Sequence, residues 1–203
     1  MKLYSKRLIP TLLTLYAFSL FACKDKPEST TTDINQSVDT KTVQEFDSLY
    51  IAYSFDFPVG IPDAKGYYIA QKFQENSHLG DDWNAVTGGN SDLGDPIYAV
   101  ANGYVKVVKN YGGGWGNVIR IIHQQVNGEM VESLYAHCDT VLVKEKQWIK
   151  KGAQIGTIGT ANGAYLAHLH FEMRSDLELP LGPGYSNETK GYLNPTRFIK
   201  ANR

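Results

Sequence analysis

The sequence predicts a mainly β protein, built from antiparallel sheets with few short helices. Apolar runs of strand length alternate with turn residues, and no long segment repeats its apolar residues at the helical period of 3.6. The 203 residues include 19 glycines and 13 tyrosines. Glycine is common in turns and tyrosine in strands, so the composition favours the same fold class.

The N-terminal residues have the charge pattern of an export signal. The first seven contain three cationic side chains, and residues 8–22 are apolar and uncharged, a run too short for a comfortable membrane span. The run ends in the letters LFAC, which resemble the cleavage site of bacterial lipoproteins, although Phe21 stands where a small residue is usual. We therefore expect a lipoprotein-type signal peptide at residues 1–22, a lipidated Cys23, and an envelope protein anchored to a membrane. A plain secreted protein or an uncleaved anchor is the alternative.

The segment after the signal predicts a flexible tether. Residues 23–45 are polar and rich in Ser, Thr and Asp, so they cannot bury enough apolar surface to offset the entropy of ordering. The folded domain is expected at residues 46–203. With Cys23 lipidated, Cys138 has no partner, which excludes a disulfide framework. The net charge of −1 gives no reason to expect nucleic acid as a partner.

Strand and turn signals follow one another through the folded domain. Asn102-Gly103 and Asn127-Gly128 each lie between two apolar runs, which is a strong hairpin signal. A short C-terminal helix is expected at residues 195–201. The expected strands cover residues 97–100, 104–108, 118–123, 130–137, 155–159 and 169–174.

The first candidate site is the stretch HLGDD. His78 and Asp82 are an even number of positions apart, so on an extended segment both side chains point the same way. Gly80 between them lets the backbone pass close to a bound ion. An imidazole and a carboxylate together suit zinc, whereas a surface histidine beside an acidic turn is the plainer reading. A shift of one residue would select Asp81 instead of Asp82.

Two further stretches place histidines at strand spacing. His168 and His170 in HLHFE share one face of a strand, with apolar residues facing the other way. Two such imidazoles in a core would lose hydration without evident partners, so a metal or catalytic site explains them better. Tyr135 and His137 in YAH also share a face by this rule, although an edge-strand histidine without a role is the alternative.

Two other residues favour plain roles. His123 ends a strand-like run and has no motif partner, so we expect a structural or surface histidine. Cys138 follows His137 and therefore points away from it on a strand. We expect a small core residue there and no nucleophile.

In combination, the three stretches resemble the lysostaphin-type (LytM-like) zinc endopeptidases, which hydrolyse peptidoglycan. The family pattern is HxGxD, then YxH, then HLHFE, and this chain has HLGDD, YAH and HLHFE in that order. The connecting segments GDPIYAVANGYV, GGGWGNVIRIIH and IKKGAQIGTIGTANG agree as well. The resemblance covers about residues 74–174, and more loosely LNPTRFI at 193–199. It implies the lysostaphin-type peptidase fold, in which antiparallel sheets form a sandwich-like groove.

The resemblance also implies residue roles. His78, Asp82 and His170 would hold one zinc ion per chain, while His137 and His168 would be catalytic without binding the metal. Two imidazoles and one carboxylate leave an open fourth position for water. Since the chain has no HExxH glutamate, the two remaining histidines are the natural proton carriers. His168 as base and His137 as oxyanion or leaving-group partner is one assignment, and the reverse is the other.

The function expected from this resemblance is hydrolysis of amide bonds in the peptide stems or cross-links of peptidoglycan, with a zinc-activated water as nucleophile. The alternative is a non-enzymatic wall-binding regulator of another hydrolase. Regulators of that kind typically lack the metal ligands, whereas this chain keeps all three. A cupin-like oxygenase would need a further histidine downstream, and none follows His170.

Overall fold

The computed structural model describes residues 45–203. The expected signal peptide at 1–22, Cys23 and nearly all of the tether lie outside these residues and stay predictions. The strands are β1 Tyr67–Gln71, β2 Asp81–Ala85, β3 Pro96–Tyr98, β4 Gly103–Asn110, β5 Asn117–Gln124, β6 Met130–Cys138, β7 Trp148–Ile149, β8 Gln154–Thr157, β9 Leu169–Arg174 and β10 Tyr192–Leu193. The helical turns are η1 Ser48–Tyr50, η2 Gly60–Ala64 and η3 Glu75–Ser77, and the α-helix is α1 Pro195–Ala201.

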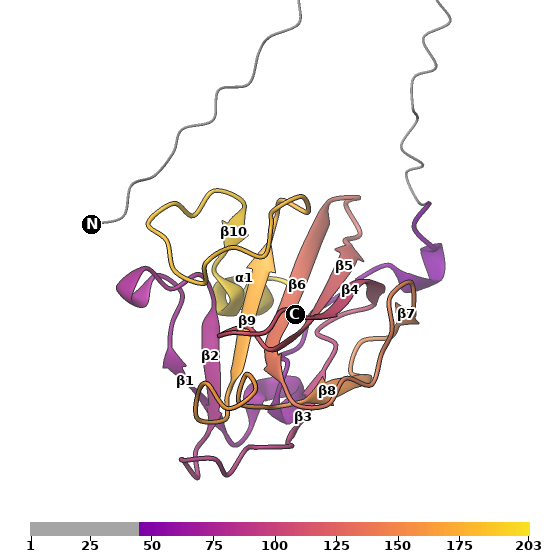
Figure 1. The fold of residues 1–203 in the computed structure, drawn as a ribbon. Helices are drawn as coiled ribbons and strands as arrows, with labels where there is room; N and C mark the ends of the chain where they lie inside the picture. The colour runs from indigo at the N-terminus through magenta and orange to yellow at the C-terminus, as the bar shows by residue number, and fades with distance from the viewer. Residues whose placement is uncertain (1–44) are drawn as a thin grey trace, which may run out of the picture. The chain divides into compact units, whose positions relative to one another are not determined.

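One large antiparallel sheet dominates the fold (Figure 1). Its strand order is β1-β2-β9-β6-β5-β4-β7, with β10 paired to β9, and a separate two-stranded sheet joins β3 to β8. Every strand pair is antiparallel. This confirms the predicted class of antiparallel β protein with few short helices. None of the described helices has the length and apolar character that a membrane crossing requires.

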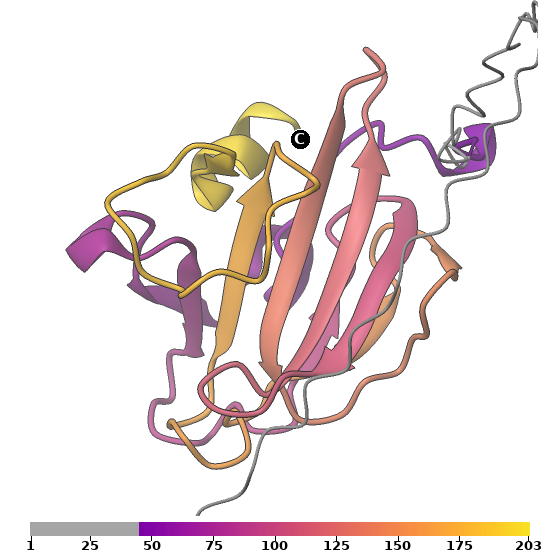
Figure 2. The ribbon, with the colours of Figure 1, turned by 45° about the horizontal axis from the view of Figure 1, so that its top comes forward.

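The two faces of the large sheet differ in chemistry. On β9, Leu169, Phe171 and Met173 belong to the main hydrophobic core, which also includes residues of β3 and β8. The alternate residues of β9, His170 among them, point to the opposite face because side chains alternate along a strand. The segment between β9 and β10 passes over this second face (Figure 2), and its Leu181 packs against Val118 and its neighbours there. The candidate site lies on this second face.

One of the two hairpin predictions is confirmed. The Asn127-Gly128 turn joins β5 to β6, and these strands pair along their length. The Asn102-Gly103 hairpin is wrong, because β3 pairs with β8 and β4 pairs with β5 and β7. The Asn102 side chain instead connects neighbouring segments: its amide nitrogen donates to the Ile51 carbonyl at 3.0 Å, and its oxygen accepts from the Lys151 amide at 2.9 Å.

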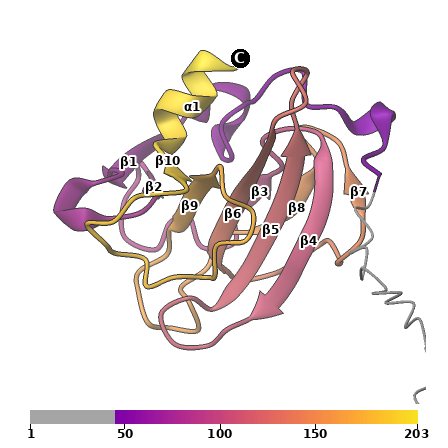
Figure 3. The same cartoon turned by 90° about the horizontal axis from the view of Figure 1, so that it is seen from above.

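The edge beside the candidate site holds two strands that the sequence did not indicate, β1 and β2. Figure 3 shows β1, β2 and α1 at the same end of the sheet. The C-terminal helix confirms its prediction. Asn194 caps it by accepting from the Arg197 amide at 2.8 Å, and Pro195 occupies its first turn, where no amide hydrogen is needed.

Candidate metal centre

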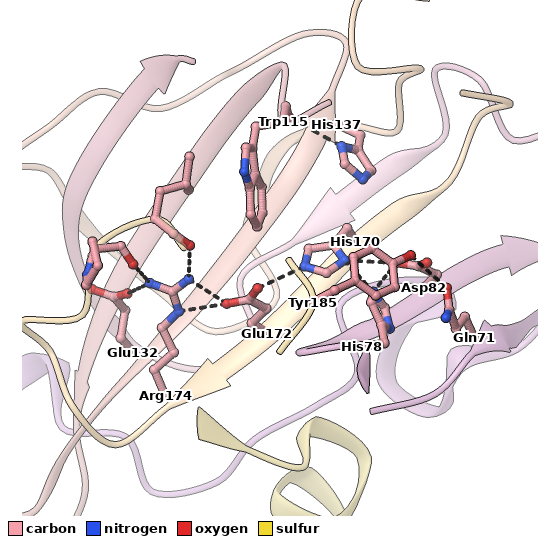
Figure 4. A network of polar contacts seen from close by, with 12 residues as sticks. Gln71, His78, Asp82, Trp115, Glu132, His137, His170, Glu172, Arg174 and Tyr185 are labelled. Atoms are coloured by element: carbon pink, nitrogen blue, oxygen red, sulfur yellow. Dashed lines mark hydrogen bonds and ion pairs between the residues drawn. The ribbon is translucent and has the colours of Figure 1, made fainter. Parts of the chain in front are cut away.

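The three predicted metal ligands meet at one point. Asp82 on β2 lies directly opposite His170 on β9, and His78 precedes β2 by a short bend. The atoms that converge are His78 Nε2, His170 Nδ1 and Asp82 Oδ1. Their separations are 3.0 Å between the two nitrogens, 2.9 Å from His170 to Asp82 and 3.3 Å from His78 to Asp82 (Figure 4).

This donor set fits a zinc ion. A tetrahedral zinc with bonds of about 2.0–2.1 Å holds its ligand atoms roughly 3.3 Å apart, close to the spacing found. Two imidazole nitrogens and one carboxylate oxygen are ligands that zinc accepts, and they leave a fourth position open. Both histidines are buried, whereas Asp82 is partly exposed. The three donors therefore form a nearly closed cradle with one open side.

The carboxylates and imidazoles at the cradle stabilise each other's charged forms. Burial alone would raise the pKa of Asp82, but hydrogen bonds from His170 and His78 outweigh it and hold that pKa below its usual range. Burial alone would lower the pKa of His170, but Asp82 and Glu172 outweigh it and raise the pKa to about 9. The metal-free centre therefore holds a proton on His170 at neutral pH, which a metal ion would have to displace.

Asp81 is excluded from the centre by its own partners. Its carboxylate accepts the Phe73 amide at 2.9 Å, and the Thr196 amide and hydroxyl at 3.1 and 2.6 Å. These partners lie on the side of β2 away from the cradle, because neighbouring residues of a strand face opposite ways. The structure therefore places Asp82, and not Asp81, among the converging donors.

His137 and His168 line the same cavity without joining the cradle. Each ring is oriented through Nδ1 by a backbone carbonyl: Trp115 for His137 at 3.3 Å, and Leu166 for His168 at 2.8 Å. Because a carbonyl only accepts, Nδ1 carries the hydrogen in both rings, and a neutral ring keeps its lone pair on Nε2. Burial, helped by the neighbouring His170 and His168, lowers the pKa of His137 to about 3.

The position of His137 depends on an irregularity in β6. Tyr135 belongs to the main core and hydrogen-bonds the Val100 amide there, so it does not share a face with His137 as expected. The register of β5 and β6 shifts next to Asn117, and His137 has a φ of +63°. Such a bulge re-aims a side chain, here out of the core and into the cavity.

The cavity has a volume of about 440 Å³ and aromatic walls. Trp115, Tyr165 and Tyr185 surround the histidines, and the tyrosines are about half exposed. These three aromatic residues were not predicted as part of the site, although Trp115 lies in the glycine-rich GGGWG and Tyr165 shortly precedes HLHFE. The lining residues are Gln71, His78, Asp82, Gly114, Trp115, His137, Tyr165, His168, His170, Pro183, Gly184 and Tyr185.

The two residues expected to be structural are buried elsewhere. His123 Nδ1 contacts the Asn102 carbonyl at 2.8 Å, and Nε2 contacts the Ser133 hydroxyl at 2.7 Å. It does not line the cavity. Cys138 is a buried free thiol in the main core, and burial holds its pKa well above the usual range, to about 12. The predictions of a structural histidine at position 123 and of a small core residue at position 138 are confirmed.

Comparison with known proteins identifies the family. The family model for peptidase family M23 matches residues 77–183, more than half of the chain. The chain belongs to peptidase family M23. The match includes the three converging donors and both neighbouring histidines, so the predicted resemblance to lysostaphin-type peptidases is confirmed.

Two relatives share part of the sequence of this chain, and a solved structure shares its fold. Lipoprotein NlpD of Yersinia enterocolitica is 44% identical over 81 residues, which cover 40% of this chain and 78% of that one. Murein hydrolase activator NlpD of Escherichia coli (strain K12) is 40% identical over 98 residues, 45% of this chain but only 24% of the relative's length. A Pseudomonas aeruginosa structure assigned to peptidase M23 covers 74% of this chain and 52% of its own, with 23% identity and a TM-score of 0.52, which shows the shared fold.

Proposed function

We propose that this M23 protein is a zinc-dependent endopeptidase that hydrolyses amide bonds in the peptide stems or cross-links of bacterial peptidoglycan. The observation that supports this most is the geometry of one cavity. Three donors suited to zinc converge in it, and two further histidines line the same space, each with its Nδ1 held by a backbone carbonyl. A bound zinc would polarise a scissile carbonyl and lower the pKa of a nearby water toward neutrality.

The two free histidines are the proposed proton carriers. His168 Nε2 lies 3.9 Å from Asp82 Oδ1, beside the open side of the cradle. It is placed to accept the proton that a water loses when it attacks the carbonyl. His137 is also an acceptor while neutral, so an oxyanion or leaving-group role requires that it first receive a proton. Once either ring is protonated, it can return that proton to the departing amine.

The cavity walls suit an extended peptide. Trp115 lies 5.3 Å from the ring of His170, and Tyr165 lies 5.2 Å from that of His137, measured between ring centroids. These flat surfaces border the cradle while leaving it open to solvent. They offer apolar contact along a peptide and do not require a bulky side chain, which suits the small residues of wall peptides.

The choice of peptidoglycan and of the cell envelope rests on the relatives. The Yersinia enterocolitica relative is named a lipoprotein, and the Escherichia coli relative is named a murein hydrolase activator. Together with the LFAC signal, this supports an exported protein anchored to a membrane through lipidated Cys23, within reach of the wall. The domain at residues 46–203 would then act at the end of the proposed tether.

A second candidate function is activation of another wall hydrolase without catalysis. The name of the Escherichia coli relative favours it, although this chain spans only 24% of that protein. An activator needs no metal, so the three converging donors and the two histidines beside them would have no role in that function. The retained site therefore favours the peptidase, and the two functions predict different results with purified protein.

The test is metal analysis combined with wall digestion by matched variants. Wild type should bind about one zinc per chain and release soluble peptides from purified peptidoglycan. His170→Ala should lose both properties, because it removes a ligand. His168→Ala and His137→Ala should keep zinc and lose digestion. Wild type that binds zinc and digests no peptidoglycan, but stimulates a second hydrolase, would favour the activator.

A further inference from the structure

A row of buried charges leads from the metal cradle across the second face of the sheet. It consists of Glu172 and Arg174 on β9, Glu132 on β6 and Arg120 on β5. All four side chains are buried, and Arg174 is the largest fully buried side chain among the described residues. Figure 4 shows the row continuing from His170 through Glu172 to Arg174. Buried charges are costly to desolvate, so this arrangement needs an explanation beyond stability.

Glu172 divides its two oxygens between the cradle and Arg174. Oε1 lies 3.0 Å from His170 Nε2, while Oε2 accepts from Arg174 Nε at 2.7 Å and contacts Nη2 at 2.6 Å. A carboxylate at this place accepts the hydrogen of His170 Nε2. In the neutral ring that would bind a metal, the lone pair is thereby left on Nδ1, the atom that faces Asp82 and His78.

Arg174 uses its remaining donors on the segment between β9 and β10. Nη1 donates to the Pro180 carbonyl at 3.0 Å and Nη2 to the Leu181 carbonyl at 2.7 Å. Arg120 extends the same pattern by donating to the Leu179 carbonyl at 2.9 Å. Two guanidinium groups therefore hold three consecutive carbonyls of an otherwise irregular segment against the sheet.

The same segment supports the other histidine of the cradle. Shortly after Leu181 it reaches Gly184, whose carbonyl accepts the Leu79 amide at 2.9 Å, and Tyr185, whose ring lies 5.1 Å from that of His78. Within residues 45–203, His78 Nδ1 has no hydrogen-bond partner. On its Nδ1 side the ring of His78 is therefore supported by packing against Tyr185, while its Nε2 faces His170 and Asp82 in the cradle.

We propose that Glu172 and Arg174 are positioning residues of the metal centre. Glu172 orients His170 directly, and Arg174 holds Glu172 as well as the segment that backs His78. Neither is one of the three converging donors or lines the cavity, yet both histidines of the cradle depend on them. This inference rests on the proposed zinc site, and it adds that zinc affinity is set in part by this pair.

A purely structural role makes a different prediction. If the four charges only stabilised the fold, a substitution would lower the unfolding free energy and leave the zinc affinity of the folded protein unchanged. Glu132 provides the matched control. It is as buried as Glu172, and its Oε1 lies 2.7 Å from Arg120 Nε and 3.8 Å from Arg174 Nη1, but it makes no contact with His170.

The test compares Glu172→Gln with Glu132→Gln in the full chain. Zinc affinity is measured by competition with a chromophoric chelator, and the folded state of each metal-free variant is checked by circular dichroism. We expect Glu172→Gln to bind zinc about 10- to 100-fold more weakly. Glu132→Gln should stay within about threefold of wild type, well short of that loss. Glu172→Asp keeps the charge but moves the carboxylate oxygens away from His170, so it should weaken zinc binding as Glu172→Gln does. It replaces Glu172→Gln in the comparison if that variant does not fold.

A second readout needs no metal. In the metal-free protein, Arg174→Lys should speed amide hydrogen exchange at Leu79 and Ser186, whose amides donate to the Gly184 and Ser77 carbonyls where this segment meets the cradle, because lysine cannot hold both the Pro180 and Leu181 carbonyls. Equal zinc affinity in wild type and Glu172→Gln, with unchanged exchange in Arg174→Lys, would overturn the inference. Wild type that binds no zinc would instead refute the proposed function, so the two failures are distinguishable.

Discussion

At the scale of single residues, the metal centre depends on three donor atoms that converge and on a bulge in β6 that turns His137 into the same cavity. The resemblance to lysostaphin-type peptidases predicted the donors His78, Asp82 and His170, whereas residue type and spacing alone left Asp81 open as an alternative. Spacing alone could not place His137, because strand alternation put it beside Tyr135. A positive φ and a register shift reverse its direction, and neither has a clear signature in the letters YAH.

The buried His123 predicts a specific acid sensitivity. Burial lowers its pKa to about 4 from the ordinary 6.5, so between these values the unfolded chain binds a proton that the folded chain does not. The contribution of neutral His123 to the free energy of unfolding is therefore complete above about pH 6.5 and is lost as the pH falls toward 4. Between pH 7.5 and pH 4.5 we expect a loss of roughly 2–3 kcal/mol from this residue.

Urea unfolding of the metal-free protein at the two pH values measures this loss. His123→Gln cannot titrate, so its free energy of unfolding should fall less between pH 7.5 and pH 4.5 than that of wild type. Chelator in both samples removes any contribution from metal release. An equal fall in both proteins would show that His123 does not cause the acid sensitivity.

At the scale of elements, strands bounded by clear turns were predicted well. Strands β5, β6 and β9 and the helix α1 were expected almost residue for residue. Strand β2 was missed because DDWNA has no simple alternation, even though it places Asp82 opposite His170. The hairpin at Asn102 failed because its side chain bonds to distant segments, which turn propensity cannot indicate.

The HLGDD segment passes so close to β9 that adding one methyl group at Gly80 should change the zinc affinity. A Cβ on Gly80 would lie 2.5 Å from the Phe171 carbonyl and 2.9 Å from the ring of His170. Gly80→Ala should therefore displace His170 and lower zinc affinity at least about tenfold, besides costing roughly 1–3 kcal/mol of stability. Competition with a chromophoric chelator measures the affinity.

Gly103→Ala is the matched control for this effect. A Cβ there would lie equally close to a backbone oxygen, 2.5 Å from the Ile122 carbonyl, but outside the cradle and its cavity. It should lower stability by a similar amount and leave zinc affinity unchanged. Similar zinc affinity in the two variants would show that Gly80 has no special relation to the metal centre.

At the scale of the whole molecule, the centre joins segments that are far apart in sequence. His78 and Asp82 precede most of the sheet, and His170 is on one of its central strands, so metal binding should favour the folded chain as a unit. The resemblance to lysostaphin-type peptidases indicated which residues would meet. It did not indicate that the segment between β9 and β10 would cover them, because the contacts of this segment depend on buried charges such as Arg174.

Metal removal should therefore lower the melting temperature. A ligand at a thousandfold its dissociation constant stabilises the folded state by about 4 kcal/mol, which for a domain of this size is a shift of about 10 °C. Scanning calorimetry with zinc and with chelator measures this shift. His170→Ala should show little response to zinc, and a response equal to that of wild type would place the ion elsewhere.

The most direct test of the proposed peptidase is mass analysis of the products from peptidoglycan fragments of defined structure. Zinc-loaded wild type should cut one class of amide bond, so that the two products together exceed the substrate by the mass of one water. His168→Ala, with its zinc retained, should leave the fragments intact. Fragments left uncut by wild type that holds one zinc per chain, or cut at a glycosidic bond, would contradict the proposed function.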